Sequence, residues 1–386
     1  MSWHSERTVR AVVALCGALA LVSCAPRRDR ELRVGLLALL DGELAPQSGI
    51  PSREGAQLAV DELNERGGVV IGGTRRRLRL IVRSYAPRAD AAASAARDLV
   101  NLDSVDVVIG PQLSAHAIAA STVAEDAHVP MIAPMASNPQ VTAGKSHVFR
   151  LAFLDPFQGE MLARYALDDL HAKRAAVLYD VSNAYGSEIA QLFRETFTRG
   201  GGAVVASETF TSDQKTDFTV QLRRIAAAHV DVLLLPNYSA VDSFQVRQAR
   251  AVGVTAVFLG SDNWDPPALR RVHEAVGTVF THQWSPTVTL AQTQGFVERY
   301  RLRYGSDPRS TAAMTYDAVQ VVADAAHRAG GMEGDPLAEA IAQTSGFEGV
   351  TGTITFGGSR DPKRTGLVSR LGAEKDTILR LVTPAP

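Results

Sequence analysis

Short apolar runs alternate with amphipathic stretches along most of this 386-residue chain. Residues 33–40 (RVGLLALL) form a continuous apolar run, and residues 56–63 then place their apolar side chains on one face of a helix. Gly67-Gly68 follows as a helix stop. Continuous apolar strands that alternate with helices are typical of parallel sheets covered on both faces. The pattern therefore predicts an α/β fold.

The same alternation continues through the first two thirds of the chain. It predicts strands at residues 78–84, 105–110, 129–133, 175–180, 203–209, 231–236 and 256–260, with helices between them that include 88–102 and 114–126. Residues 296–328 are helix-rich, and residues 349–382 return to strand-like sequence. Two such series predict two doubly wound lobes. The basic run 75–77, after Gly72-Gly73, is predicted to form a solvated turn.

Composition narrows the function classes. Apolar residues make up 46% of the chain, charged residues 21%, and the formal net charge is −1, so we expect a folded protein without a nucleic-acid partner. We find no HExxH, Walker A, GxSxG or GxGxxG signature, so an enzyme is not expected, and a secreted hydrolase is the weakest hypothesis. The nine histidines show no pair at ligand spacing, which predicts no metal site and no cofactor.

The N-terminus carries the pattern of an export signal. Arg7 and Arg10 precede an apolar run that ends in Leu21-Val22-Ser23-Cys24, which resembles the lipobox of bacterial lipoproteins. We predict a signal peptide at 1–23, a lipid on Cys24 and a tether at 24–31, hence an extracytoplasmic protein held to the cell membrane by its lipid anchor alone. The alternatives are an ordinary secretory signal with a chance cysteine, or a cytosolic N-terminal helix.

Small polar residues follow three of the predicted strands, in the segments 110–114, 134–139 and 260–264. In doubly wound sheets, ligands bind outside the carboxyl ends of the strands. The hydroxyl of Ser114 at a helix N-terminus suits an anion, and Asp262 beside the ring of Trp264 suits an ammonium group. Together these groups predict a site for a small zwitterion.

Each of these segments also has a purely structural interpretation. Ser114 serves equally well as a helix N-cap, and residues 137–139 as a turn. Asp262 is placed either to cap a helix that starts near Pro266 or to lie exposed in a loop.

Taken together, the motifs resemble those of the periplasmic leucine/isoleucine/valine-binding proteins of ABC importers, a branch of the type I periplasmic binding proteins. The resemblance covers about residues 32–382. It rests on Ser48-Gly49, Glu54-Gly55-Ala56, residues 61–64, Gly67-Gly68, Gly72, Val108-Ile109-Gly110, residues 136–139, Phe149-Arg150, Tyr179-Asp180, Tyr185-Gly186, Asp217-Phe218, residues 248–250 and residues 315–318.

The resemblance implies two doubly wound parallel-sheet lobes joined by three crossovers, the Venus-flytrap arrangement that closes on its ligand. The N-terminal lobe would comprise residues 32–154 plus 285–355, and the C-terminal lobe residues 155–284 plus 356–386.

The resemblance also implies a ligand site. Ser114 matches a family serine that holds the carboxylate of an amino acid, and Met135 and Ser137 match a backbone carbonyl and a hydroxyl that contact the ligand. Asp262 stands where the family usually has a glutamate that pairs with the ammonium, and Ser48 where it often has a tyrosine. The complete set of candidate ligand-binding residues is Ser48, Ser114, Met135, Ala136, Ser137, Tyr185, Tyr238, Asp262 and Trp264.

The expected function is that of a lipid-anchored solute-binding protein of an ABC transporter. It would bind an amino acid or amide in the interlobe cleft by jaw closure and deliver it, as a monomer, to a membrane permease. Branched-chain amino acid transport is the function that the resemblance implies. The alternative is a ligand-sensing or cell-wall-enzyme-activating lipoprotein with the same fold.

Overall fold

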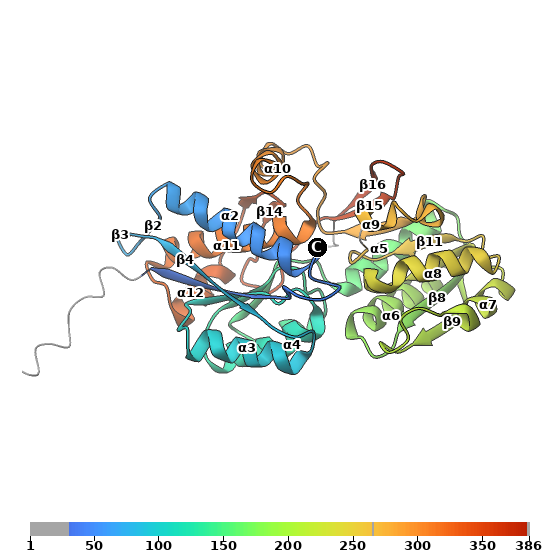
Figure 1. Cartoon of the computed structure of the whole chain (residues 1–386), viewed down its shortest axis with the longest axis horizontal. Helices are drawn as coiled ribbons and strands as arrows, with labels where there is room; N and C mark the ends of the chain where they lie inside the picture. The colour runs from blue at the N-terminus through green and yellow to red at the C-terminus, as the bar shows by residue number, and fades with distance from the viewer. Residues whose placement is uncertain (1–30, 265, 384–386) are drawn as a thin grey trace, which may run out of the picture. The chain divides into compact units, whose positions relative to one another are not determined.

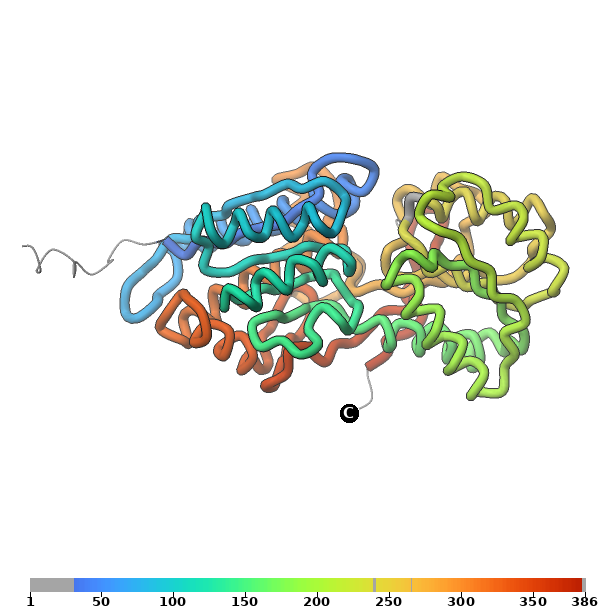
Figure 2. The backbone as a smooth tube through the Cα atoms, turned by 90° about the horizontal axis from the view of Figure 1, so that it is seen from below, coloured from blue at the N-terminus to red at the C-terminus, as the bar shows by residue number. Residues whose placement is uncertain are grey.

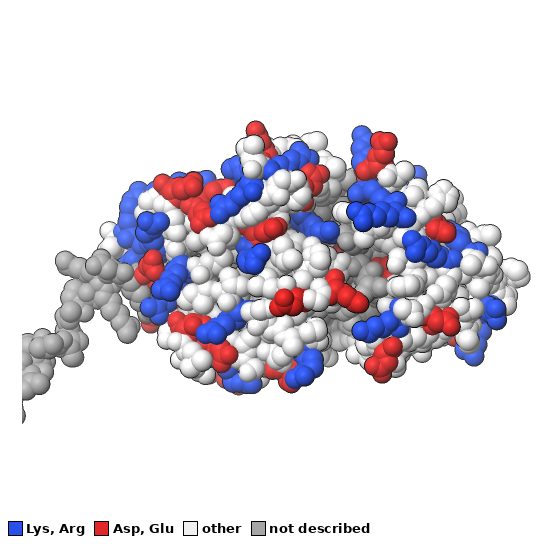
Figure 3. All heavy atoms as spheres, in the orientation of Figure 1, with Lys and Arg blue, Asp and Glu red and all other residues white. Residues whose placement is uncertain are grey.

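The fold is given by a computed structural model that describes residues 31–264 and 266–383. The predicted signal peptide (1–23) and the lipid attachment at Cys24 lie outside the described residues, as does the predicted tether apart from Glu31. Among the residues that are described, no helix is both long enough and apolar enough to cross a membrane. Lys and Arg side chains are interspersed with Asp and Glu over the face drawn in Figure 3.

The first sheet contains five parallel strands in the order β4-β1-β5-β6-β7. Their bounds are β4 (Leu78–Ser84), β1 (Leu32–Ala38), β5 (Val107–Ile109), β6 (Met131–Ala133) and β7 (Val148–Arg150). Parallel strands place their carboxyl ends on the same edge of a sheet. The segments that follow β5 and β6 therefore lie along one edge, as the sequence pattern predicted.

Helices cover both faces of the first sheet (Figure 1). Leu32, Val34 and Leu36 of β1 pack in one apolar cluster, whereas Leu37 packs in the other, because successive side chains of a strand point to opposite faces. The first cluster includes side chains of α2 (Gly49–Glu65), α10 (Ala291–Tyr304), α11 (Ser310–Ala329) and α12 (Gly334–Ala342), and the second includes those of α3 (Ala89–Asn101) and α4 (Ser114–Asp126).

Helices α2 and α11 pack closely at Gly55. A Cβ atom at this position would lie 2.1 Å from the carbonyl oxygen of Ala312, so no other residue fits without moving the helices apart. Late sequence thereby covers the first sheet, which explains why residues 296–328 are helix-rich without intervening strands.

The second sheet contains seven strands in the order β16-β15-β12-β11-β10-β8-β9. Their bounds are β8 (Arg174–Asp180), β9 (Ala203–Phe210), β10 (Val232–Leu235), β11 (Val257–Gly260), β12 (Val279–His282), β15 (Gly366–Arg370) and β16 (Thr377–Val382). Strands β8 to β12 are parallel, and β15 and β16 pair antiparallel at one edge.

Helices also lie on both faces of the second sheet. One apolar cluster includes α5 (Asp155–Asp168) and α6 (Ala184–Arg199), and the other includes α7 (Thr219–Ala227), α8 (Ser239–Ala251) and the short α9 (Pro266–Leu269). The chain passes between the two sheets three times: after β7, after β12 and before β15. Figure 2 shows connecting segments between the two sheets with their helices. The α/β fold with doubly wound parallel sheets is as the sequence predicted.

Several details differ from the sequence-based predictions. Strand β3 (Thr74–Arg76) pairs antiparallel with β2 (Val69–Ile71), so the basic run belongs mostly to a hairpin strand, and the turn lies at Gly72-Gly73. The run remains largely solvated, as expected. The alternation pattern also missed β7 and β12, because each is a short strand that ends in a polar residue.

Four short elements lie between the larger ones. Strands β13 (Phe347–Gly349) and β14 (Gly352–Ile354) form a second hairpin, and η1 (Pro139–Val141) and η2 (His273–Ala275) are single 3₁₀ turns.

Candidate functional site

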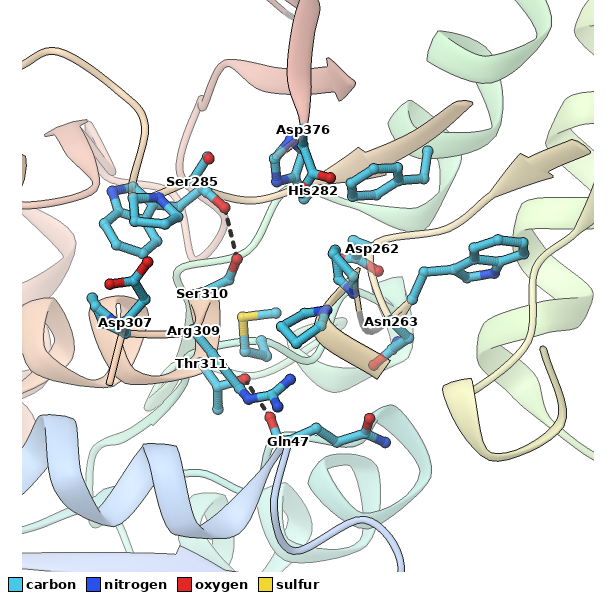
Figure 4. A pocket seen from close by; sticks show the side chains of 18 of the residues that line it. Gln47, Asp262, Asn263, His282, Ser285, Asp307, Arg309, Ser310, Thr311 and Asp376 are labelled. Atoms are coloured by element: carbon cyan, nitrogen blue, oxygen red, sulfur yellow. Dashed lines mark hydrogen bonds between the residues drawn. The ribbon is translucent and has the colours of Figure 1, made fainter. Parts of the chain in front are cut away.

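A cavity of about 530 Å³ lies where the loops at the carboxyl ends of both sheets meet. The first sheet and its helices contribute Ser48, Gln112 and Met135, and the second contributes Asp262 and Trp264. In Figure 4, Asp262 and Asn263 lie on one side of the cavity, and Gln47, Arg309, Ser310 and Thr311 lie on the other. The cavity is therefore lined by segments that are far apart in the sequence.

Asp262 follows β11. It is the least exposed of the Asp, Glu, Lys and Arg residues that line the cavity, with 9% of its surface exposed. The hydroxyl of Tyr185 donates to its Oδ1 atom at 2.5 Å, and Nε2 of Gln283 donates to its Oδ2 atom at 2.7 Å. Burial raises the pKa of Asp262, although both hydrogen bonds favour the charged form. No Lys, Arg or His of the described chain forms an ion pair with it.

A second carboxyl group, that of Asp155, is completely buried behind the cavity at the start of α5. Burial raises its pKa well above the ordinary value, and the charge of Asp262 contributes to the rise, whereas Ser137 and Arg150 oppose it. A positive charge placed beside these two carboxyl groups would favour their ionised forms.

Aromatic rings form one wall of the region. The rings of Tyr185 and Tyr238 stack with centroids 5.3 Å apart and planes 11° from parallel. The indole Nε1 atom of Trp264 donates to the carbonyl of Leu235 at 3.1 Å, which fixes the orientation of the ring beside the cavity. These contacts give the cavity a rigid, partly apolar boundary.

On the first-sheet side, two buried polar atoms have no hydrogen-bond partner within the described part of the chain: the hydroxyl oxygen of Ser48 and Oε1 of Gln112. Both residues line the cavity. The amide of Gln112 is anchored from its other end, since Nε2 donates to the hydroxyl of Ser52 at 2.6 Å. Buried polar groups normally have partners, so unpartnered ones at a cavity point to a ligand.

The loop that carries Gln112 begins at Gly110, which has a φ of 86°. A Cβ atom there would lie 2.5 Å from the carbonyl oxygen of Leu37, so glycine is required where β5 leaves the sheet beside β1.

The predicted site residues divide into two groups. Five of them line the cavity: Ser48, Met135, Tyr238, Asp262 and Trp264. The other four, Ser114, Ala136, Ser137 and Tyr185, are buried next to these residues and are not part of the cavity lining. The structure thus brings the nine candidates into one region, but in two layers.

Ser114 is engaged within the protein. Its hydroxyl accepts a hydrogen bond from the backbone N–H of Asn138 at 3.3 Å. The helix N-cap residue is Leu113, so the alternative interpretation of Ser114 as an N-cap is wrong. Ser114 instead connects the loop after β5 to the loop after β6.

The loop after β6 is held by the buried guanidinium of Arg150, which donates to the backbone carbonyls of Ala136 (3.3 Å) and Asn138 (2.8 Å). Asn138 in turn donates through Nδ2 to the carbonyl of Ala184 at the start of α6, at 3.3 Å. This hydrogen bond joins the loop after β6 to the first residue of α6, a helix that packs on the second sheet.

Sequence reasoning missed Asp155, Gln112 and Gln283. Asp155 lies five residues beyond the Phe149-Arg150 motif, at the start of a helical pattern, and a carboxylate in that position normally indicates only a favourable helix start. Gln112 belongs to a segment that the sequence did single out. Gln283 had no sequence signal, because it follows β12, a strand that the pattern did not predict.

A second cavity of about 700 Å³ lies on the other side of Leu44, Leu113 and Tyr238, which line both cavities. Asp180 and Lys215 are among its lining residues. Of the nine predicted site residues, Tyr238 alone borders it, so the predicted site corresponds to the first cavity.

Comparisons with known proteins agree with this architecture. A family model described as periplasmic binding protein matches residues 31–366. The Leu/Ile/Val-binding protein BraC3 of Rhizobium johnstonii is 30% identical over 348 residues, which cover 89% of this chain and 92% of that protein.

Two solved structures are similar in both fold and sequence. The leucine binding protein LivK of Thermotoga maritima has a TM-score of 0.85 and 29% identity, covering 92% of this chain and 99% of that one. The branched-chain amino acid transporter substrate binding protein LivJ of Streptococcus pneumoniae, solved with isoleucine, has a TM-score of 0.84 and 31% identity, covering 92% and 100%.

The family model and these relatives are named as binding proteins, and LivJ is named as a transporter substrate binding protein, which agrees with the prediction that the chain is not an enzyme. The extent of the family match and the similarity over nearly the whole length lead to one conclusion: the chain belongs to the periplasmic binding protein family.

Proposed function

We propose that the protein is a lipid-anchored binding protein of an ABC importer and that its ligand is an amino acid with an aliphatic side chain. An extracytoplasmic location follows from membership of a periplasmic family. The finer elements, namely the anchor at Cys24, the ligand class, the permease partner and the monomeric state, are parts of the proposal.

The observation that carries the proposal is the carboxylate of Asp262. It borders a cavity, it is buried, and its two hydrogen-bond donors, Tyr185 and Gln283, are neutral. A buried carboxylate without a cation is costly unless an opposite charge reaches it. The ammonium group of an amino acid supplies that charge and leaves its carboxylate directed away from Asp262.

The opposite side of the cavity suits the rest of such a ligand. The unpartnered hydroxyl of Ser48 and the neighbouring loops are available to a ligand carboxylate, and Met135 and Trp264 offer apolar contacts to a side chain. The relatives BraC3, LivK and LivJ carry names that refer to branched-chain amino acids, which supports an aliphatic ligand. Ser114 and Ser137 remain candidate contacts if the loops shift on binding.

The mechanism that we propose is closure of two lobes, with boundaries at residues 32–154 plus 285–355 and residues 155–284 plus 356–386. A ligand that contacts Ser48 from one lobe and Asp262 from the other favours the closed population, because only that state makes both sets of contacts. The permease would then recognise the closed form.

The test is calorimetric titration of the protein with leucine, isoleucine and valine. 4-Methylpentanoate serves as the matched control, because it is leucine without the ammonium group. We expect at least one amino acid to bind and raise the melting temperature, and the control to bind more than 100-fold more weakly, from the roughly 3–5 kcal/mol lost with a buried ionic partner. Equal affinity for leucine and 4-methylpentanoate, or no binding of any amino acid, would refute the proposal.

A further inference from the structure

The first sheet carries a second cluster of polar side chains at the opposite edge from the cavity. His128 precedes β6, His147 precedes β7, and Asp335 lies in the first turn of α12. One ligand atom from each of the three residues lies within 4.8 Å of the others. Asp335 is 207 and 188 positions away from the two histidines, so spacing along the chain gives no indication of the cluster.

Two of the three distances between ligand atoms in the cluster are close to those of a metal site. Oδ1 of Asp335 lies 3.2 Å from Nδ1 of His128 and 2.7 Å from Nε2 of His147. Adjacent ligands of a tetrahedral zinc ion are about 3.3 Å apart, given metal–ligand bonds of about 2.0–2.2 Å. The first distance already fits, and the second requires a small outward movement of an exposed carboxylate.

A supporting carboxylate lies behind the buried histidine. Oε1 of Glu125 is 3.6 Å from Nδ1 of His147, and that nitrogen has no hydrogen bond within the described residues. Glu125 is itself fixed, since it accepts bonds from the backbone N–H of Ser146 and of His147, both at 2.8 Å. A carboxylate behind a ligating histidine orients the ring and directs its other nitrogen at the metal.

From this geometry we propose that His128, His147 and Asp335 bind a divalent transition-metal ion, with Zn²⁺ as the preferred ion. Two imidazole nitrogens and one carboxylate oxygen are a typical ligand set for zinc, and a water molecule completes a tetrahedron. Mg²⁺ and Ca²⁺ prefer oxygen ligands and do not suit this set. The proposal departs from the expectation, based on histidine spacing, that the chain holds no metal site.

The role of the ion would be structural. It would join α12, which comes late in the chain, to the two loops that enter β6 and β7. These loops lie at the amino ends of the strands, whereas the cavity lies at the carboxyl ends, so the ion would not contact the bound solute.

The turn that follows α4 accounts for a histidine at position 128, but not for its position beside His147 and Asp335. His128 has a φ of 53° just beyond the end of α4, and His229 has a φ of 47° at the corresponding place beyond α7. Both occur in the sequence Ala-His-Val, and both side chains are exposed. Only His128 of this pair meets a second histidine and a carboxylate, which makes His229 a matched control.

The test is calorimetric titration of Zn²⁺ into the tag-free protein, as processed by the expressing cell. We expect one ion per chain, no comparable binding of Mg²⁺ or Ca²⁺, and a higher melting temperature with Zn²⁺ than with EDTA. His128→Asn and Asp335→Asn should each weaken Zn²⁺ binding at least tenfold. Asn tolerates the left-handed backbone of residue 128, so His128→Asn should fold. His229→Asn should bind Zn²⁺ like the unchanged protein.

Two results would overturn the proposal. One is the absence of saturable Zn²⁺ binding. The other is unchanged Zn²⁺ affinity in both His128→Asn and Asp335→Asn, which would mean that zinc binds elsewhere. Solute affinity measured with and without Zn²⁺ should differ less than twofold, and a larger effect would contradict a purely structural ion.

Discussion

The two edges of the first sheet carry different kinds of polar site. At the carboxyl edge, the cavity is bordered by Asp262, a buried carboxylate whose partners are neutral. At the amino edge, Asp335 is exposed and lies directly beside two imidazoles. The first arrangement leaves a negative charge for a ligand to neutralise, and the second collects nitrogen and oxygen ligands around one point.

The difference shows how burial changes the chemistry of the same carboxyl group. Burial raises the pKa of Asp262, whereas hydrogen bonds from His147 and His128 lower the pKa of Asp335. We propose that the buried carboxyl group of Asp262 takes the ammonium group of a solute that brings its own apolar surface. An exposed carboxylate between imidazoles is a site for a metal ion that keeps a water ligand.

The largest expected effect is a loss of amino acid affinity that leaves Zn²⁺ affinity unchanged. Asp262→Ala should weaken amino acid binding more than 100-fold, because the ammonium loses a buried partner worth roughly 3–5 kcal/mol. Zn²⁺ affinity should not change. Calorimetry with each ligand measures both quantities on one preparation, and circular dichroism verifies that the variant is folded. Unchanged amino acid affinity would rule out Asp262 as the ammonium partner.

A smaller effect is expected from the hydroxyl of Tyr185, which donates to Asp262. Tyr185→Phe keeps the ring that stacks on Tyr238 but removes a hydrogen bond to a charged group, worth about 1.5–3 kcal/mol. We expect amino acid affinity to fall about tenfold or more, again without an effect on Zn²⁺. The control is Tyr179→Phe, a half-buried tyrosine outside the cavity lining, which should bind normally. Equal losses in both variants would indicate a general loss of stability.

The smallest expected effect is the release of protons when an amino acid binds. Burial raises the pKa of both Asp155 and Asp262 above the ordinary value of 3.8. In the ligand-free protein, the stability linked to these groups is full below pH 3.8 and is lost as the pH rises through the raised pKa values. A bound ammonium lowers both pKa values, so binding should release protons, and amino acid affinity should increase with pH in this window.

Calorimetry at pH 5 in two buffers with different ionisation enthalpies counts the protons that are released. We expect up to two protons per ligand in the unchanged protein, one from each carboxyl group, and fewer in Asp262→Asn. Proton uptake on binding would contradict the assignment of the ammonium to this pair of carboxyl groups.

Much of the fold followed from local pattern. Helix α4 and strand β4 occupy the predicted residues 114–126 and 78–84, because alternating apolar runs and amphipathic segments determine such elements locally. Strand β12 escaped the prediction, since four residues that end in His282 carry too little periodicity. The missed strand also concealed Gln283, which holds Asp262.

The sequence alone determined the α/β class, the order of most strands and helices, and the three loop segments at the carboxyl ends of β5, β6 and β11. The export signal up to Cys24 stays a prediction. These properties depend on residues that are close together in the chain. The tertiary structure decided which polar groups face the cavity and which are engaged behind it, as with Ser48 and Ser114. It also brought Asp335 to His128 and His147 across more than 180 positions. Such contacts depend on how helices pack on the sheet, and no local periodicity encodes them.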